Sequence, residues 1–120
     1  MIIGTGIDIV ELERIEGAFK RQPRFVSRVL TESEQDAFYK LKNRRQIEFL
    51  AGRFAAKEAF VKAAGTGISS TFSWQDIEIK KETSGKPYLY VPSYLKIMHL
   101  SISHSALYAV ASVIIESKTS

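Results

Sequence analysis

The fold is decided by residues 45–64, which read RQIEFLAGRFAAKEAFVKAA. The stretch contains no proline and a single glycine, Gly52, and apolar side chains recur along it at helical spacing. Gly65 and Gly67 follow it as residues that commonly end a helix. We therefore expect one long helix at the centre of the molecule.

The segments before this helix predict one strand and two shorter helices. Residues 2–10 are β-branched and apolar, which indicates a strand. Residues 11–21 carry apolar side chains at helical spacing, and Pro23 ends that helix. Residues 31–34 (TESE) form a capping box that opens a further helix to about Leu41.

The segments after the long helix are mostly strands. Alternating or apolar patterns predict strands at 76–82, 87–91, 100–103 and 108–115, with turns at Ser84-Gly85 and Ser105-Ala106 and a short helix or loop over 93–98. Because helices cluster early and strands late, we expect an α+β fold with a small antiparallel sheet packed on the long central helix. At 120 residues we expect a single domain, 1–120.

Composition limits the compartment and the partners. The chain has no cysteine, which excludes disulfides and thiolate metal sites. The N-terminal MIIGTGIDIVEL has no basic region and reaches Asp8 early, so it predicts neither a signal peptide nor a spanning helix, and we expect a cytoplasmic protein with no membrane partner. The net charge of +4 favours an anionic partner without choosing among nucleic acid, membrane, phosphate ligand and acidic protein.

Two carboxylates stand in unusual places. Asp8 shares a strand face with Gly4 and Gly6, which would leave room for something to approach it, although an Asp at a strand end could equally cap the next helix. Glu58 falls in the middle of the apolar stripe of the long helix, where a carboxylate must be paired, metal-bound or protonated. The alternative for Glu58 is an ordinary ion pair with Lys62, four residues later.

Basic residues form the next group of candidates. Arg53 and Lys57 lie one turn apart on the long helix, and Lys86 lies on a tight turn whose amides, if free, could bind phosphate oxygens. His104 ends a polar run, SISHS, at residues 101–105. Taken singly, each of these is more often a solvated or structural residue.

Taken together, five short motifs resemble those of the holo-acyl-carrier-protein synthases in the 4′-phosphopantetheinyl transferase superfamily. They are GIDIVE at 6–11, FLAGR at 49–53, FAAKEAFVK at 54–62, GKP at 85–87 and SISH at 101–104. The resemblance covers nearly the whole chain in matching order. Ser103 stands where many relatives have threonine, Phe54 where many have tryptophan, and the segment 92–99 is slightly short. The resemblance implies a 4′-phosphopantetheinyl transferase-like fold.

The resemblance also implies a reaction in fatty acid biosynthesis. A serine of apo-acyl-carrier protein would attack the β-phosphorus of coenzyme A, and 3′,5′-ADP would leave. Asp8 and Glu58 would hold Mg²⁺, which prefers hard oxygen ligands, and a carboxylate or a metal-bound water would take the serine proton. Lys62 would stabilise the leaving phosphate, so that Asp8, Glu58 and Lys62 form the catalytic set, and Glu11 would orient the metal water.

The resemblance further implies how the substrates bind. Coenzyme A would contact Arg53, Lys57, Gly85, Lys86, Pro87 and His104, some of them supplied by a neighbouring subunit of a homotrimer. The acidic acyl-carrier protein would dock on Arg14, Arg21, Arg24, Phe25 and Arg28, of which Arg14, Arg21 and Arg28 recur every seven residues. Without the resemblance, this set indicates only a solvated helix face.

The homotrimer is also suggested by a second apolar side of the long helix. That side holds Phe49, Gly52, Ala56, Phe60 and Ala63. A domain of this size has little core to cover two sides of one helix, so a neighbouring copy could cover one of them. Two rival classes remain: a nucleic-acid-binding module, which leaves Glu58 unexplained, and an inactive structural trimer, which does not need both carboxylates. We expect no nucleic acid partner.

Overall fold

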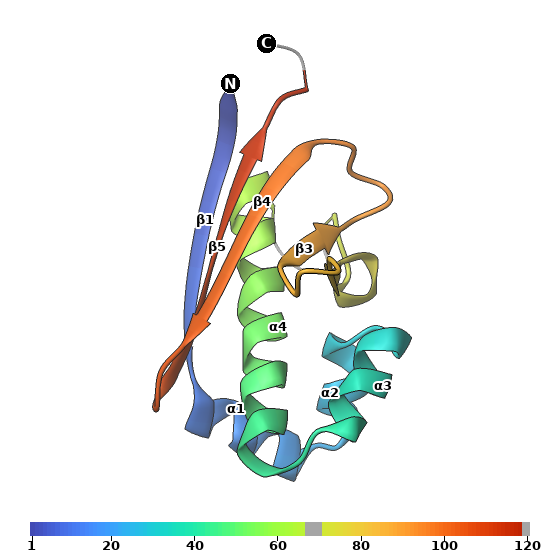
Figure 1. The fold of residues 1–120 in the computed structure, drawn as a ribbon, viewed down its shortest axis with the longest axis vertical. Coiled ribbons are helices and arrows are strands. Elements are labelled where there is room, and N and C mark those ends of the chain that lie inside the picture. Colours follow the sequence, from blue (N-terminus) through green and yellow to red (C-terminus); the bar gives the residue numbers. More distant parts are fainter. Residues whose placement is uncertain (67–70, 119–120) are drawn as a thin grey trace.

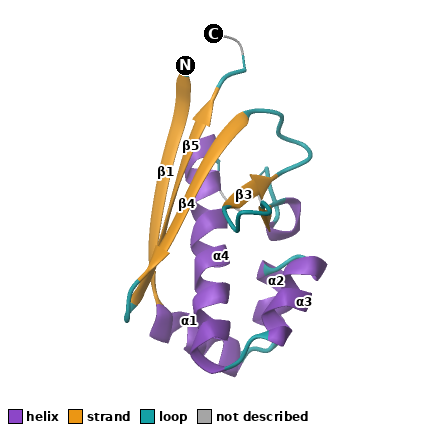
Figure 2. Ribbon diagram, viewed as in Figure 1, coloured by secondary structure: helices purple, strands orange, loops and turns teal. Residues whose placement is uncertain are grey.

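A computed structural model describes residues 1–66 and 71–118, and its central feature is a single long helix (Figure 1). A three-stranded sheet covers one side of this helix, and short helices with a two-stranded ribbon cover another (Figure 2). In chain order the elements are β1 (Ile2–Glu11), α1 (Leu12–Arg21), α2 (Arg24–Val29), α3 (Glu32–Lys40), α4 (Asn43–Ala64), the 3-10 turn η1 (Trp74–Asp76), β2 (Glu78–Lys81), β3 (Pro87–Tyr90), β4 (Ile97–His104) and β5 (Tyr108–Glu116).

Both sheets are antiparallel. The larger has the order β1-β5-β4, so the first and last strands of the chain pair directly, and Asp8 lies opposite Ala111. The smaller pairs β2 with β3. Side chains of β1 and β5 alternate between the face on α4 and the outer face, as the period of a strand requires. The predicted α+β fold, with antiparallel sheet packed on a long central helix, is confirmed.

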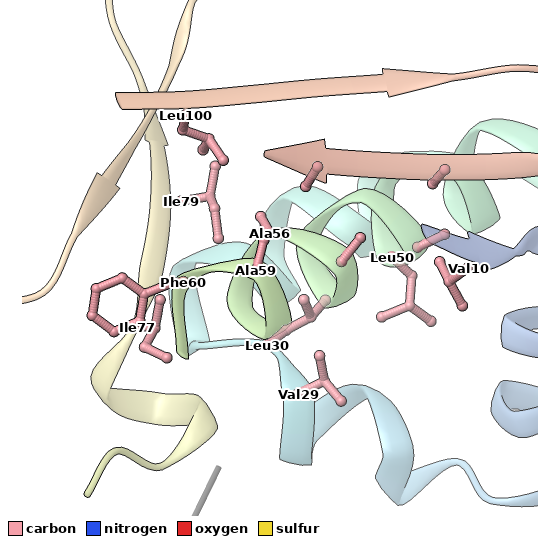
Figure 3. Packing of buried hydrophobic residues seen from close by; sticks show 14 of the residues in the cluster. Val10, Val29, Leu30, Leu50, Ala56, Ala59, Phe60, Ile77, Ile79 and Leu100 are labelled. Carbon is pink, nitrogen blue, oxygen red and sulfur yellow. The ribbon is translucent and has the colours of Figure 1, made fainter. Parts of the chain in front are cut away.

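The helix α4 is buried on two sides by its own chain. Figure 3 shows Leu50, Ala56, Ala59 and Phe60 between Leu100 of the large sheet and residues such as Leu30 and Ile77 on the opposite side. Gly52, Ala56, Phe60 and Ala63, from the second apolar side of the helix, are all buried within the single chain. This side therefore needs no neighbouring copy to cover it: Gly52 faces Ile102 of β4, and the Phe60 ring packs edge-on against those of Phe72 and Tyr94. The homotrimer itself stays a prediction.

Glycines let β1 approach α4 unusually closely. A Cβ atom at Gly6 would lie 2.1 Å from the backbone oxygen of Ala59, and one at Gly4 would lie 2.0 Å from that of Ala63. Such distances are far inside van der Waals contact, so any side chain there would push the strand away from the helix. The space beside Asp8 that the sequence suggested is thus filled by the backbone of α4, not left open for a ligand.

Other boundaries differ modestly from expectation. The helix α4 begins at Asn43, two residues before the predicted start, and ends at Gly65, whose φ of 80° is the left-handed value that suits glycine. Gly67 lies outside the described residues. The short helix α2 was not predicted, β2 begins later than expected because η1 takes Asp76, and β4 begins at Ile97 inside the segment predicted as helix or loop. No helix in the described ranges is long and apolar enough to cross a membrane.

We predict that Gly6→Ala lowers the free energy of unfolding by about 1–3 kcal/mol, because the new methyl group would collide with rigid helix backbone. Urea denaturation would measure this. The matched control is Gly17→Ala, whose Cβ would meet only the end of the flexible Arg21 side chain, at 3.0 Å, within α1. That control should be neutral or stabilising, since alanine favours a helix interior. Equal stability of Gly6→Ala and the wild type would contradict the close-approach argument.

Candidate active site

The close approach of β1 to α4 brings Asp8 and Glu58 together. Asp8 lies on the helix-facing side of β1, and its side chain is only 16% exposed. It does not cap the following helix, because Glu11 occupies that position and makes no side-chain cap bond. Instead, Asp8 Oδ1 accepts a hydrogen bond of 2.9 Å from Lys62 Nζ, which also donates to the Ile7 carbonyl oxygen at 3.1 Å.

Glu58 is the carboxylate left without a partner. Burial raises its pKa, the negative charge of Asp8 raises it further, and Lys62 lowers it by a smaller amount. Among the described residues its side chain makes no hydrogen bond or ion pair, because Lys62 contacts Asp8 and not Glu58. The ordinary helical pair between Glu58 and Lys62 is therefore not formed, and the site has an excess of negative charge that a cation would relieve.

The chemistry of this pair fits a hard divalent cation. Two carboxylates from different elements converge, one of them desolvated and unpaired, which is the donor set that Mg²⁺ takes when substrate phosphate and water complete its shell. Glu11 is less well placed for the role expected of it. It lies three residues after Asp8 on the same strand, so its side chain points to the opposite face, and it is exposed.

A cavity, which we name the basic cavity, lies on another side of α4. It has a volume of about 290 Å³ and is lined by Arg53 and His104 together with Arg45, Glu48 and Lys81. The sequence analysis did not single out Arg45 and Lys81. Arg45 could have been found from its position two turns before Arg53 on the same helix, but Lys81 reaches the cavity only through the packing of β2.

Arg53 has features that suit the binding of an anion. It is buried, its Nε atom has no hydrogen-bond partner, and its guanidinium lies 4.0 Å from the centre of the Phe49 ring. Burial lowers its pKa, and the charge of Glu34 opposes that effect. A buried guanidinium with an unused donor is costly unless a ligand completes it. His104 is half-exposed beside it, with Nδ1 3.7 Å from Glu48 Oε2.

Unlike Arg53, Lys57 has no unused hydrogen-bond donor. Its ammonium group is fully buried and donates to Val29 O at 2.7 Å, Glu34 Oε1 at 2.8 Å and Trp74 O at 3.1 Å. Since an ammonium has three donors, all are used inside the protein. The expected contact between Lys57 and coenzyme A is therefore incompatible with this structure, and Lys57 is a structural residue.

The turn between β2 and β3 also differs from expectation. Gly85 has the positive φ of 92° that favours glycine, but its amide donates to Glu82 O at 2.8 Å. The amide of Lys86 donates to Ser84 Oγ at 3.4 Å. These amides are not free to bind phosphate. The exposed side chain of Lys86, next to Pro87, is what the turn presents to a ligand.

The expected carrier-binding residues lie on two helices. Arg14 and Arg21 are exposed on α1, and Arg24 and Arg28 are exposed on α2. Phe25 is only 8% exposed: its ring centre lies 6.0 Å from that of Phe54, and the Arg28 guanidinium lies 5.7 Å from it on another side. We name the four arginines the basic patch. Phe25 is largely buried beneath Arg28 and packs against Phe54.

The carboxylate pair around Glu58 and the cavity lined by Arg53 lie on different sides of α4. Arg53 and Glu58 are five residues apart on α4, which places them about 140° apart around the helix axis. Within one chain the two residues therefore face different sides of the helix.

Comparison with known proteins gives one consistent result. A family model described as the 4′-phosphopantetheinyl transferase superfamily matches residues 4–113. The chain is 62% identical over 116 residues to the holo-(acyl-carrier-protein) synthase of Shouchella clausii, covering 97% of this chain and 99% of that protein. It is 54% identical over 117 residues to that of Bacillus subtilis, covering 97% of both chains.

Solved structures agree with the curated relatives. A crystal structure of a holo-(acyl-carrier-protein) synthase from Bacillus anthracis in complex with CoA (3′,5′-ADP) superimposes with a TM-score of 0.92 and 52% identity, covering 98% of this chain and 99% of that one. The Helicobacter pylori holo-(acyl-carrier-protein) synthase in complex with coenzyme A gives a TM-score of 0.83 and 34% identity, covering 93% and 99%.

We predict that Glu58→Gln raises the melting temperature at neutral pH when no divalent cation is present. Because the pKa of Glu58 is raised on folding, the folded state binds this proton more tightly than the unfolded state does, so the contribution of Glu58 to stability falls as pH rises through the folded-state pKa. The glutamine variant avoids this loss. Its advantage should be a few degrees at neutral pH and should vanish below the ordinary glutamate pKa of about 4.3. Melting curves across pH would show this, with the exposed Glu82→Gln as control. A lower melting temperature for Glu58→Gln at neutral pH would refute it.

Proposed function

The chain belongs to the 4′-phosphopantetheinyl transferase superfamily, and we propose that it transfers the 4′-phosphopantetheine group of coenzyme A to a serine of an apo-acyl-carrier protein in fatty acid biosynthesis. The observation that carries the mechanism is the partly buried carboxylate of Glu58 beside Asp8, which makes no hydrogen bond or ion pair among the described residues. In the transfer, the serine Oγ forms a bond to the β-phosphorus while the bond to the bridging pyrophosphate oxygen breaks. The products are the holo-carrier protein and 3′,5′-ADP.

The residues of the site divide the tasks of this mechanism, and Glu58 has two of them. Asp8 and Glu58 would hold Mg²⁺, which would neutralise charge on the pyrophosphate. Lys62, already fixed by Asp8 and the Ile7 carbonyl, supports the leaving phosphate with its remaining donor. Burial and the charge of Asp8 raise the pKa of Glu58, which favours the acceptance of the serine proton by its carboxylate. The cytoplasmic location expected from the cysteine-free sequence stays a prediction.

The basic cavity would hold the nucleotide end of coenzyme A. Its free Arg53 donor, with His104, Arg45 and Lys81 around it, suits phosphate groups. The exposed Lys86 beside Gly85 and Pro87 would add charge at the same end. The basic patch would dock the acidic carrier protein, since exposed charges of this kind mainly steer association.

We predict that Asp8→Ala and Glu58→Ala each remove most transfer activity, by roughly a hundredfold or more in kcat, because the charge that develops in the transition state loses its counterion. Mass spectrometry of an apo-acyl-carrier protein incubated with coenzyme A, Mg²⁺ and each variant measures the gain of one phosphopantetheine. Both variants should stay folded by circular dichroism. Near-normal activity of either variant, or full activity in excess chelator, would rule out the metal assignment.

A homotrimer with shared active sites is part of this proposal. The outer face of the large sheet exposes Ile3, Ile7 and Ile9 of β1 together with Ile97, Tyr108 and Ile114. Ile7 and Ile9 are each 63% exposed. A contiguous apolar sheet face of this kind usually marks an interface. A neighbouring copy would also explain how Arg53 and Glu58, on different sides of one helix, serve one substrate.

We predict that Ile7→Glu dissociates the assembly and abolishes transfer, because it places a charge in the proposed interface, whereas Leu95→Glu, at a 74% exposed apolar residue away from the sheet, changes neither. Sedimentation velocity and the transfer assay would test this. Mixing the inactive Arg53→Ala and Glu58→Ala chains should restore activity, since about a quarter of the sites in randomly mixed rings would be intact. An active monomer, or no rescue on mixing, would refute shared sites.

A further inference from the structure

The short helix α2 is held at its C-terminal end by side chains from other parts of the chain. The final carbonyl groups of a helix have no partner within it, and a helix of six residues has little stability of its own. In this protein Gln75 Nε2 lies 2.9 Å from Ser27 O, 3.2 Å from Arg28 O and 2.9 Å from Leu30 O, and its two hydrogens are shared among these three oxygens. Every one of these oxygens lies in the last turn of α2 or just after it.

The remaining acceptor at this end is taken by Lys57. Its buried ammonium donates to Val29 O at 2.7 Å, and a positive charge at a helix C-terminus also stabilises the helix dipole. Gln35 Nε2 adds a bond of 3.0 Å to Leu30 O. We name Gln75, Lys57 and Gln35 the α2 clamp.

The element that carries Gln75 is also linked to α2 through an aromatic ring of α4. Trp74, its neighbour in η1, stacks on Phe54 of α4 with ring centres 5.2 Å apart, and the Phe54 ring centre lies 6.0 Å from that of Phe25 in α2. Because η1 caps the carbonyls of α2 and also packs on the ring that Phe25 contacts, the orientation of α2 is fixed without any long run of helix. Arg24 and Arg28, two of the four arginines of the basic patch, lie on this short helix.

We propose that Gln75 is a positioning residue for the carrier protein: by clamping α2 it holds Arg24 and Arg28 in the arrangement that the acidic partner binds. The inference rests on the proposed docking of the carrier on the basic patch. Gln75 itself is exposed and its side chain bonds only to backbone, so its removal deletes no bond of the Lys57–Glu34 pair or of the carboxylate site.

The test compares Gln75→Ala with a matched control. Gln46→Ala removes the same kind of bond, from Gln46 Nε2 to Phe38 O at 3.3 Å, but at the end of α3, which carries no residue of the basic patch. For Gln75→Ala we expect the KM for the acyl-carrier protein to rise about three- to tenfold, which is the scale of one or two exposed charge contacts. The KM for coenzyme A and kcat should stay within about twofold, because loss of docking alone leaves the chemical step unchanged. Hydrogen exchange should quicken in residues 24–30, and Gln46→Ala should change none of these quantities.

A double-mutant cycle separates positioning from general weakening. In an Arg24→Ala/Arg28→Ala background, Gln75→Ala should raise the carrier KM no further, because there is no longer a charge to position. The inference is overturned if Gln75→Ala leaves the carrier KM unchanged, raises both KM values alike, or acts equally in the double-arginine background. If the Arg24→Ala/Arg28→Ala variant keeps a normal carrier KM, the docking assignment fails and takes this inference with it. If the arginine changes raise the carrier KM and Gln75→Ala does not, only the role of Gln75 is refuted.

Discussion

Lys57 and Glu34 form an ion pair of 2.8 Å with side-chain exposures of 0% and 2%, and the arrangement of the elements around α4 depends on it. Removing two charges from water costs several kcal/mol, which is recovered only when every donor and acceptor is used. Here Lys57 fills its three bonds, and Glu34 accepts from the amide of Thr31 at 2.9 Å and from that of Ile79 at 2.7 Å. The pair therefore joins α2, α3, α4, η1 and β2 at one point. A break in it would leave a buried charge without a partner, which is among the most destabilising changes a protein can suffer.

The pair explains why α4 can be buried on two sides in so small a molecule. The sheet covers one side through close backbone contact at Gly4 and Gly6. Short elements (α2, α3, η1 and β2) pack on the other side, and each is too short to be stable without contacts to the rest of the chain. The hydrogen bonds of the Lys57–Glu34 pair connect them to α4. Side chains of α4 therefore point in three directions around the helix axis. Lys57 points to the short elements, Glu58 and Lys62 point to β1, and Arg53 points to the basic cavity.

The local patterns of the sequence predicted the elements well, and the long-range partners poorly. The capping box of Thr31 and Glu34 formed as expected, since both residues lie within one turn. Helical spacing also identified Glu58 as a carboxylate on an apolar stripe. Spacing could not show that Glu34 serves both the cap and Lys57, because the two residues are 23 positions apart. For the same reason Lys57 resembled a ligand-binding residue, and the second apolar side of α4 resembled an interface, when partners elsewhere in the chain cover both.

The direction in which each residue of α4 points also gives the two carboxylates of the candidate site different partners. Asp8 has an ion pair with Lys62, whereas the Glu58 side chain makes no hydrogen bond or ion pair among the described residues. The two carboxylates would therefore take different roles: burial raises the pKa of Glu58, which favours the exchange of a proton there, while the ion-paired Asp8 would serve as the constant metal ligand. The asymmetry follows from geometry alone: Lys62, one turn beyond Glu58, reaches across to the strand instead of back along its own helix. The glycines of β1 make that reach possible, because only a strand lying against the helix backbone brings Asp8 within 2.9 Å of the lysine.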